Sequence, residues 1–191
     1  MEAFLVSCGI VALAEIGDKT QLLAFILAAK FRRPLPIIAG ILTATLANHA
    51  GAGALGAWLT ALLSPETLRW GLGISFLAMA VWTLIPDTFD ERDNRLTRFG
   101  VFGTTVVGFF LAEMGDKTQI ATVALAAHYH AFYAVVAGTT LGMMVANVPA
   151  VALGDRIAQR MPVRLVHAVA AGIFAILGVI TLFRGGARWG L

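Results

Sequence analysis

The sequence predicts an all-α integral membrane protein with six transmembrane helices, built as two inverted-topology repeats of three helices each. The prediction rests on an apolar composition, six long apolar runs and an internal repeat. Of the 191 residues, 59% are hydrophobic and 13% are charged, whereas a soluble domain is about half apolar and about a quarter charged. So few charges could not cover a water-soluble globule, which excludes a soluble enzyme. The single cysteine, Cys8, excludes an internal disulfide and a cysteine-based zinc or iron–sulfur site.

Six apolar runs follow one another along the chain, and a helix needs about 20 such residues to cross a bilayer. They cover residues 3–29, 35–63, 68–85, 99–127, 131–153 and 165–183. Proline, charged or polar residues end these runs in order, at Lys30 to Pro34, Ser64 and Pro65, Pro86, His128, Asp155 and Arg184. The charged segment 87–98 separates a first repeat, 1–86, from a second, 99–191, and is predicted to be a cytoplasmic linker.

The distribution of basic residues predicts the orientation. The first, third and fifth loops hold nine lysines and arginines, and the opposite side holds three. Because cytoplasmic loops carry the excess of positive charge, we expect these three loops in the cytoplasm and both termini on the outer side of a plasma (inner) membrane. The nine residues are Lys30, Arg32, Arg33, Arg92, Arg95, Arg98, Arg156, Arg160 and Arg164.

The internal repeat is clearest in one segment of each half. Residues 14–21 read AEIGDKTQ, and residues 112–119 read AEMGDKTQ, an offset of 98. Each copy then contains three spans, and an odd number makes the second copy enter the membrane from the opposite side. Inverted repeats of this kind build transporters, whose substrate site lies at the repeat interface near mid-bilayer.

The repeated segment places six charged residues near the middle of two spans: Glu15, Asp18, Lys19, Glu113, Asp116 and Lys117. Each charge there costs about 2.5–3.5 kcal/mol, which is difficult to explain for a scaffold. On a continuous helix, spacings of three and four residues put each triplet on one face, and inverted symmetry turns the two faces together. The glycine within each motif favours close helix approach or local unwinding.

Pairing within each helix is the structural alternative. Glu15–Lys19 and Glu113–Lys117 are i,i+4 pairs that could neutralise each other. That pairing would leave Asp18 and Asp116 as spare buried carboxylates, so we favour a functional role.

The chemistry of these residues suits a hard divalent cation. Carboxylate oxygens are the ligands of Ca²⁺, Mn²⁺ and Mg²⁺, and we expect Glu15, Asp18, Glu113 and Asp116 to bind the metal. Four carboxylates and two lysines sum to −2, so protons should occupy the empty cluster and leave when metal enters. The expected supporting residues are Lys19 and Lys117, together with six residues that could equally make interhelical hydrogen bonds: Thr20, Gln21, Thr118, Gln119, Asn48 and Asn147. We interpret His49 as packing or cavity-lining, and assign no role to His167.

The doubled motif closely resembles the signature of the GDT family, which includes Golgi manganese/calcium transporters and bacterial manganese exporters. The resemblance covers essentially the whole chain. It implies a secondary antiporter, not an enzyme, that moves Mn²⁺ or Ca²⁺ out of the cytosol in exchange for protons. The family's essential acidic residues fall on Glu15, Asp18, Glu113 and Asp116. The short chain and linker resemble the bacterial branch, which implies Mn²⁺ export. No prosthetic group and no nucleic-acid partner are expected, and nothing indicates a homo-oligomer.

Three other functions fit parts of the pattern. The carboxylates could line a cation channel, or the Asp–Lys pairs could bind a zwitterion in an exporter of small organic solutes such as amino acids. The chain could also be a membrane scaffold without transport activity. The oxygen ligands alone leave Mn²⁺ against Ca²⁺ open, together with the proton stoichiometry.

Overall fold

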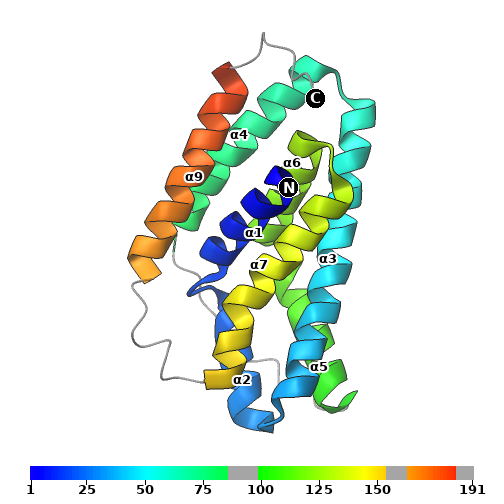
Figure 1. The fold of residues 1–191 in the computed structure, drawn as a ribbon, viewed down its shortest axis with the longest axis vertical. Helices are drawn as coiled ribbons and strands as arrows, with labels where there is room; N and C mark the ends of the chain where they lie inside the picture. Colours follow the sequence, from blue (N-terminus) through cyan, green and yellow to red (C-terminus); the bar gives the residue numbers. More distant parts are fainter. Residues whose placement is uncertain (86–98, 154–162, 184–191) are drawn as a thin grey trace.

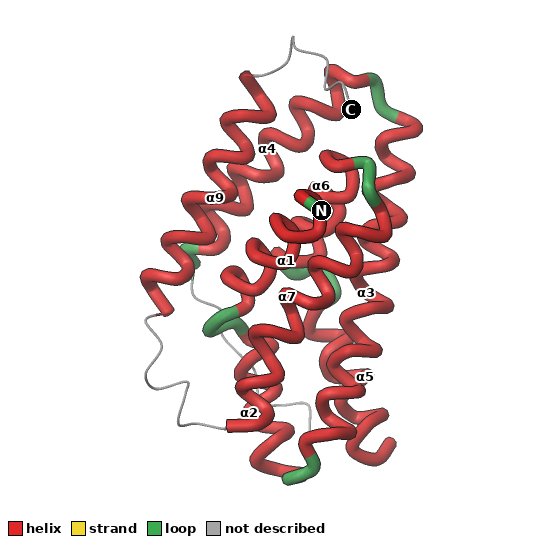
Figure 2. The backbone as a smooth tube through the Cα atoms, viewed as in Figure 1, coloured by secondary structure: helices red, strands yellow, loops and turns green. Residues whose placement is uncertain are grey.

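The computed structural model describes residues 1–85, 99–153 and 163–183. Within these ranges the chain forms eight α-helices and no strands (Figures 1 and 2). The helices are α1 (Glu2–Glu15), α2 (Lys19–Phe31), α3 (Pro34–Leu62), α4 (Pro65–Thr83), α5 (Gly100–Glu113), α6 (Lys117–Tyr129), α7 (Phe132–Leu153) and α9 (Val163–Phe183). The predicted linker 87–98 and the basic residues of the fifth loop before Val163 lie outside the described residues.

Three helices are long and apolar enough to cross a bilayer by length and composition: α3, Phe132–Ala152 of α7 and Arg164–Phe183 of α9. The predicted runs 35–63, 68–85, 131–153 and 165–183 each correspond to one helix, namely α3, α4, α7 and α9. The prediction of one continuous helix over 3–29 and another over 99–127 is wrong. Each of these runs consists of two helices separated by a break in the repeated motif.

The two breaks have the same backbone geometry. Helix α1 ends at Glu15, Gly17 has a φ of 82°, and Asp18 is the N-cap of α2. In the second repeat, Gly115 has a φ of 73°, and Asp116 is the N-cap of α6. Glycine reaches this left-handed region without a steric penalty, and aspartate is a favoured N-cap residue. The motif therefore breaks each helix, which confirms the alternative of local unwinding at its glycine and overturns the prediction that its three charges share one face of a continuous helix.

The two repeats pack on each other rather than side by side as separate units. Helix α1 packs along α7, and its repeat counterpart α5 packs along α3. Glycines allow the close approach: a Cβ on Gly138 would lie 2.5 Å from the carbonyl oxygen of Phe4, and one on Gly40 would lie 2.7 Å from Cβ of Thr105. Each broken helix thus depends on the long helix of the other repeat.

Helices α4 and α9 form a pair that lies along one side of the molecule (Figure 1). A Cβ on Gly178 of α9 would be 3.0 Å from the carbonyl oxygen of Gly73 of α4, so the two helices are in close contact. Beyond each other, α4 packs mainly on α6, and α9 packs on α1. Their repeat-related contacts, α9 on α2 and α4 on α5, are at most marginal among the described residues. Among the described residues, the pair therefore packs on the α1–α6 half of the molecule and not on the α2–α5 half.

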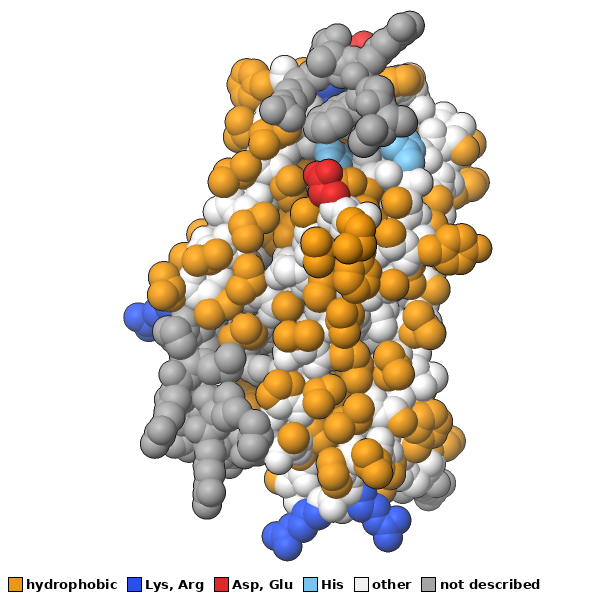
Figure 3. Space-filling view, viewed as in Figure 1, with side chains coloured by type: hydrophobic (Ala, Val, Ile, Leu, Met, Phe, Trp, Pro, Cys, Tyr) orange, Lys and Arg blue, Asp and Glu red, His pale blue; other side chains and the backbone are white. Residues whose placement is uncertain are grey.

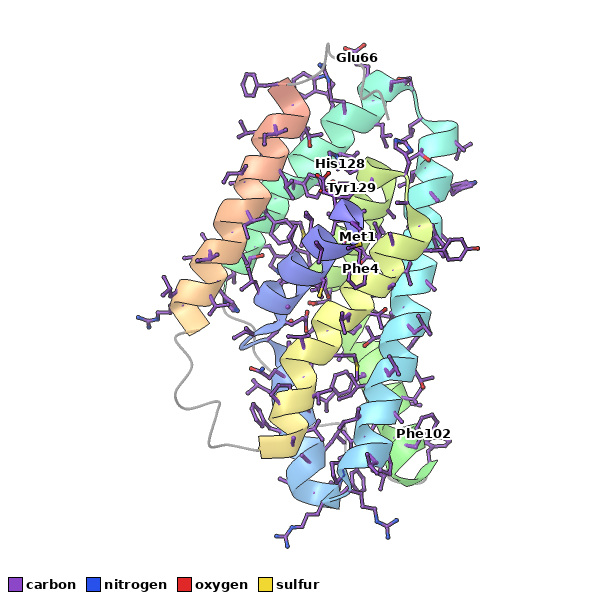
Figure 4. The ribbon with its side chains drawn as sticks, viewed as in Figure 1. Met1, Phe4, Glu66, Phe102, His128 and Tyr129 are labelled. Carbon is purple, nitrogen blue, oxygen red and sulfur yellow. The ribbon has the colours of Figure 1, made fainter. Side chains whose placement is uncertain are left out.

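The surface and the chain ends agree with a membrane environment. The face seen in Figure 3 carries hydrophobic side chains along most of its length, with basic side chains at its lower end and at its left edge near mid-height. Exposed apolar area of this extent is unusual for a soluble monomer. Glu66 at the start of α4 and His128 and Tyr129 in α6 lie towards one end, and Phe102 of α5 lies towards the other (Figure 4). The chain thus alternates between the two ends of the bundle.

The left-handed glycine predicts a position-specific effect on stability. No atom would lie within 4 Å of a Cβ on Gly115, so the Gly115→Ala variant tests the backbone alone. We expect a loss of about 1–2 kcal/mol of stability, because L-residues disfavour this conformation. The matched control is Gly172→Ala, which also has open space but lies inside α9. It should be neutral or stabilising, and thermal unfolding in detergent compares the two. An equal loss in both variants would contradict the assigned geometry.

Candidate metal centre

Three carboxylates from the two repeats meet at the breaks. Glu15 at the end of α1, Glu113 at the end of α5 and Asp116 at the start of α6 each offer an oxygen, and these oxygens lie within 4.8 Å of one another. All three residues are buried. An acidic group of this kind requires compensation by cations or protons, since an uncompensated buried charge is costly.

Lysines from the opposite repeat compensate the two aspartates. Lys117 Nζ lies 2.6 Å from Asp18 Oδ1, and Lys19 Nζ lies 2.8 Å from Asp116 Oδ1. The ion pairs therefore cross between the repeats, and the alternative of i,i+4 pairing within each helix is not what the structure has. The break causes this result, because it removes the helical spacing that would bring each glutamate to its own lysine.

The two glutamates are held by threonines of their own motifs. Thr20 donates a hydrogen bond of 2.5 Å to Glu15 Oε2, and Thr118 donates one of 2.9 Å to Glu113 Oε2. The other oxygen of each carboxylate, Oε1, is buried and has no hydrogen-bond partner among the described residues. A buried oxygen without a partner carries a desolvation cost. A proton or a metal ion at these two oxygens would remove that cost.

Helix ends divide the four acidic residues into two kinds. Asp18 and Asp116 are N-caps, where the positive end of the helix dipole favours a negative charge. Glu15 and Glu113 are the last residues of α1 and α5, where the negative end of the dipole disfavours one. The aspartates therefore suit permanent ion pairs, and the glutamates suit exchange between protons and a cation.

The glutamines close the two breaks. Gln21 Oε1 accepts a hydrogen bond of 2.9 Å from the backbone N–H of Gly17, and Gln119 Oε1 accepts one of 2.7 Å from that of Gly115. The Gln21 amide also donates to the Ala146 carbonyl at 3.0 Å. Each glutamine thus fixes the position of a break, which is the supporting role that the sequence suggested for them.

The two asparagines differ in their contacts. Asn48 accepts a 3.4 Å hydrogen bond from Gln119 and donates one of 3.1 Å to the carbonyl of Phe110 in α5. Asn147 instead donates to Met143 of its own helix, at 3.1 Å to the carbonyl and 3.0 Å to the sulfur. Asn48 therefore supports the second motif, whereas Asn147 makes no hydrogen bond to the first motif among the described residues. His49 is fully buried and neither ring nitrogen has a hydrogen-bond partner among the described residues.

Equivalent side chains around the cluster differ in solvent exposure between the two repeats. The side chain of Lys19 is 24% exposed, whereas that of Lys117 is 0% exposed. Met114 is also exposed, but the equivalent Ile16 is only partly so. Lys19 is therefore the only partly exposed member of the two ion pairs, whereas Glu15, Glu113 and Asp116 are all buried.

One residue at the site was missed by the sequence analysis. His167 of α9 is buried, and its Nε2 lies 2.6 Å from the carbonyl oxygen of Ile16 in the first break. Because a carbonyl can only accept, Nε2 carries the proton and donates. The sequence held no signal for this contact, since the two residues are 151 positions apart. The repeat counterpart of His167 is Arg69, a different residue type.

The crossed ion pairs predict unequal effects of two similar substitutions. Asp18→Asn leaves the fully buried Lys117 without its carboxylate, and we expect a loss of about 3–5 kcal/mol of stability. Asp116→Asn leaves the partly exposed Lys19 without its carboxylate partner, and we expect a clearly smaller loss of stability. Thermal unfolding in detergent measures both. The double variant Asp18→Leu/Lys117→Met is the control, because it removes both charges and should recover most of the loss. Equal losses in the two single variants would contradict the crossed pairing.

Comparison with known proteins agrees with this geometry. The family model described as "Divalent cation/proton antiporter GDT1" matches the chain twice, at residues 3–91 and 101–189. A Vibrio cholerae protein named "Putative manganese exporter" is 51% identical over 184 residues, which are 96% of this chain and 92% of that protein.

More distant relatives match nearly the whole chain. A GDT1-like protein 3 of Oryza sativa subsp. japonica is 27% identical, over 95% of this chain and 74% of the relative. A GDT1-like protein of Synechocystis is 25% identical, over 95% of this chain and 97% of the relative. No solved structure matches the chain. The two family matches coincide with the two repeats, and the chain belongs to the GDT1 family of divalent cation/proton antiporters: it is a multi-pass membrane transporter and not an enzyme.

Proposed function

We propose that this chain exports Mn²⁺ from the cytosol in exchange for protons, and that Glu15, Glu113 and Asp116 bind the metal, with Asp18 in support. The observation that carries the proposal is the pair of buried glutamate oxygens without hydrogen-bond partners beside a third carboxylate. Hard oxygen ligands suit Mn²⁺, and the name of the Vibrio cholerae relative favours this metal over Ca²⁺.

The charges suggest the exchange ratio. Asp18 and Asp116 are each neutralised by a lysine of the other repeat, which leaves two negative charges on Glu15 and Glu113. One divalent cation neutralises both, and so do two protons. We therefore propose that two protons replace one Mn²⁺, so that the cluster stays neutral in both forms and neither form leaves an uncompensated buried charge.

The architecture supports an inverted-repeat transporter. If α1–α2 and α5–α6 each form one discontinuous crossing, then the chain crosses the membrane six times, together with α3, α4, α7 and α9. Broken helices with polar residues at the break are typical of transporter binding sites near mid-bilayer. Basic residues in the first loop, at Lys30, Arg32 and Arg33, favour a cytoplasmic position for the α2–α5 end. If Mn²⁺ reaches the site past Lys19, the partly exposed member of the two ion pairs, then in this orientation the described state faces the cytoplasm.

The other candidate functions fit the contacts less well. A permanently hydrated channel would not place a fully buried Lys117 against Asp18 beside its pore. An exporter of zwitterions needs a carboxylate and an ammonium group that are available to the solute, but the motif aspartates and lysines bind each other. Both functions remain distinguishable outcomes of the experiments below.

Neutral substitution of the glutamates tests the proposed metal site. In proteoliposomes, we expect Glu15→Gln and Glu113→Gln each to abolish Mn²⁺-driven proton movement, because an amide can neither release a proton nor supply the charge. Transport of Mn²⁺, Ca²⁺ and Mg²⁺ should be measured side by side with internal pH recorded. The matched control is Glu66→Gln, which changes an exposed glutamate at the start of α4 and should leave exchange intact. Full exchange in both site variants would overturn the assignment, and competition by an amino acid would favour the solute exporter.

The proposed ratio predicts electroneutral exchange. If two protons move against each Mn²⁺, then a membrane potential set with potassium and valinomycin should not change the initial rate of Mn²⁺ transport. Acidification on the Mn²⁺-binding side should weaken Mn²⁺ binding, because protons and metal compete for the same glutamate oxygens. A rate that rises steeply with potential would contradict the ratio, and currents without proton counterflow would favour a channel.

A further inference from the structure

The asymmetric position of the α4–α9 pair is the starting observation. The contacts of the other helices follow the repeat: α1 on α7 matches α5 on α3, and α1 on α6 matches α2 on α5. The α4–α9 pair departs from it, because α9 packs on α1 and α4 on α6, with at most marginal contact to the related helices α2 and α5 (Figure 1). A molecule with two similar halves can adopt the exchanged arrangement, with α9 on α2 and α4 on α5.

A single polar contact ties this pair to the metal centre. The imidazole of His167 in α9 donates to the carbonyl of Ile16, which directly follows Glu15 in the first break. The break leaves helix α1 with carbonyl groups that no later turn of helix can satisfy, so His167 supplies one of the missing donors. His167 itself is buried, and the contact lies at a partly buried position of the break.

The second break has a different residue type at the position equivalent to His167. Arg69, the counterpart of His167, lies over the ring of Trp70 and 3.9 Å from Glu66 at the start of its own helix. Met114, the counterpart of Ile16, is 57% exposed. A histidine bond of this kind is therefore available only at the first break, and the exchanged arrangement would uncover Ile16 and cover Met114.

We propose that His167 is a positioning residue for the exchange reaction: its bond to Ile16 holds the α4–α9 pair over the α1–α6 half and breaks whenever the site opens to the other side. The inference rests on the proposed transport function. The bond stabilises the state in which the cluster is reached past Lys19, and it also fixes the backbone that carries Glu15. Movement of α9 from α1 to α2 passes across the break, so the bond must open in each cycle.

Spin-label distances test this proposal without relying on transport. In a chain with Cys8→Ala, one label at Val169→Cys in α9 is paired with a label at Leu22→Cys in α2 or Leu5→Cys in α1, positions that are all exposed. We expect His167→Leu to raise the population with a short α9–α2 distance and to lower the population with a short α9–α1 distance. One hydrogen bond corresponds to a roughly two- to tenfold change in the ratio of the two populations.

Two further variants separate positioning from general destabilisation. His167→Gln keeps an N–H donor and should restore the wild-type populations. Thr181→Val removes a 2.7 Å bond to the Leu177 carbonyl at the far end of the same helix and should change neither distance. In transport, His167→Leu should raise the KM for Mn²⁺ on the side that the described state faces, because less of the protein is in the competent state.

We call the bond between His167 and Ile16 the latch, because it is proposed to hold the α4–α9 pair over the α1–α6 half. The outcomes decide whether the latch exists, and they are distinct from the outcomes that test the proposed function. Reciprocal changes in the two distances, with rescue by His167→Gln, support the latch. Unchanged populations in a folded His167→Leu protein overturn it, and so does an equal response to Thr181→Val. If wild-type protein shows no Mn²⁺/H⁺ exchange while the distances still respond, then the proposed function fails and the latch stands. If exchange is normal and the distances do not respond, then only the latch fails.

Discussion

The crossed ion pairs between Lys117 and Asp18 and between Lys19 and Asp116 are the interaction on which the rest of the structure depends. Charges at the centre of an apolar bundle need partners, and a buried charge that loses its partner costs several kcal/mol. Neither repeat supplies its own partner, because the break separates each lysine from the glutamate of the same motif. The two halves must therefore meet before either motif is stable, and their meeting also assembles the acidic cluster.

The helix breaks give the contact between the two repeats the polar groups that a transport site needs. A continuous helix would present side chains only, whereas each break brings a helix C-terminus and a helix N-terminus to the same point. The glutamates lie at the ends that disfavour negative charge, and the aspartates lie at the ends that favour it. Each motif thus contains an aspartate whose charge is paired with a lysine of the other repeat, and a glutamate whose position suits exchange between a proton and a metal ion. The left-handed glycine is what allows the two kinds to stand three residues apart.

Much of this site could be predicted from the sequence, because buried charges are costly and the same costly segment occurs twice. That argument identified the residues of both motifs, and each of the two segments that match the family model contains one copy of the motif. The predicted shared face of Glu15, Asp18 and Lys19 was wrong, because a helical projection assumes a continuous helix, whereas the local unwinding that the motif glycine also allowed is what the structure has. The choice between pairing within and between helices depends on tertiary contacts, which no spacing reveals. The contact of His167 with Ile16 could not be predicted from the sequence, because the related position in the first repeat is Arg69 and the repeat therefore gave no signal.

The strengths of these contacts suggest how the molecule could move without coming apart. The ion pair of Lys117 and Asp18 is fully buried, and breaking it would cost about 3–5 kcal/mol. A neutral hydrogen bond such as that of His167 contributes about 0.5–1.5 kcal/mol. A motion that keeps the first and opens the second is therefore the least costly one available, and it moves the α4–α9 pair while the two motifs remain joined. On the proposed mechanism, the ion pairs hold the proposed metal site together, and the His167 bond lies at the boundary along which α4 and α9 move.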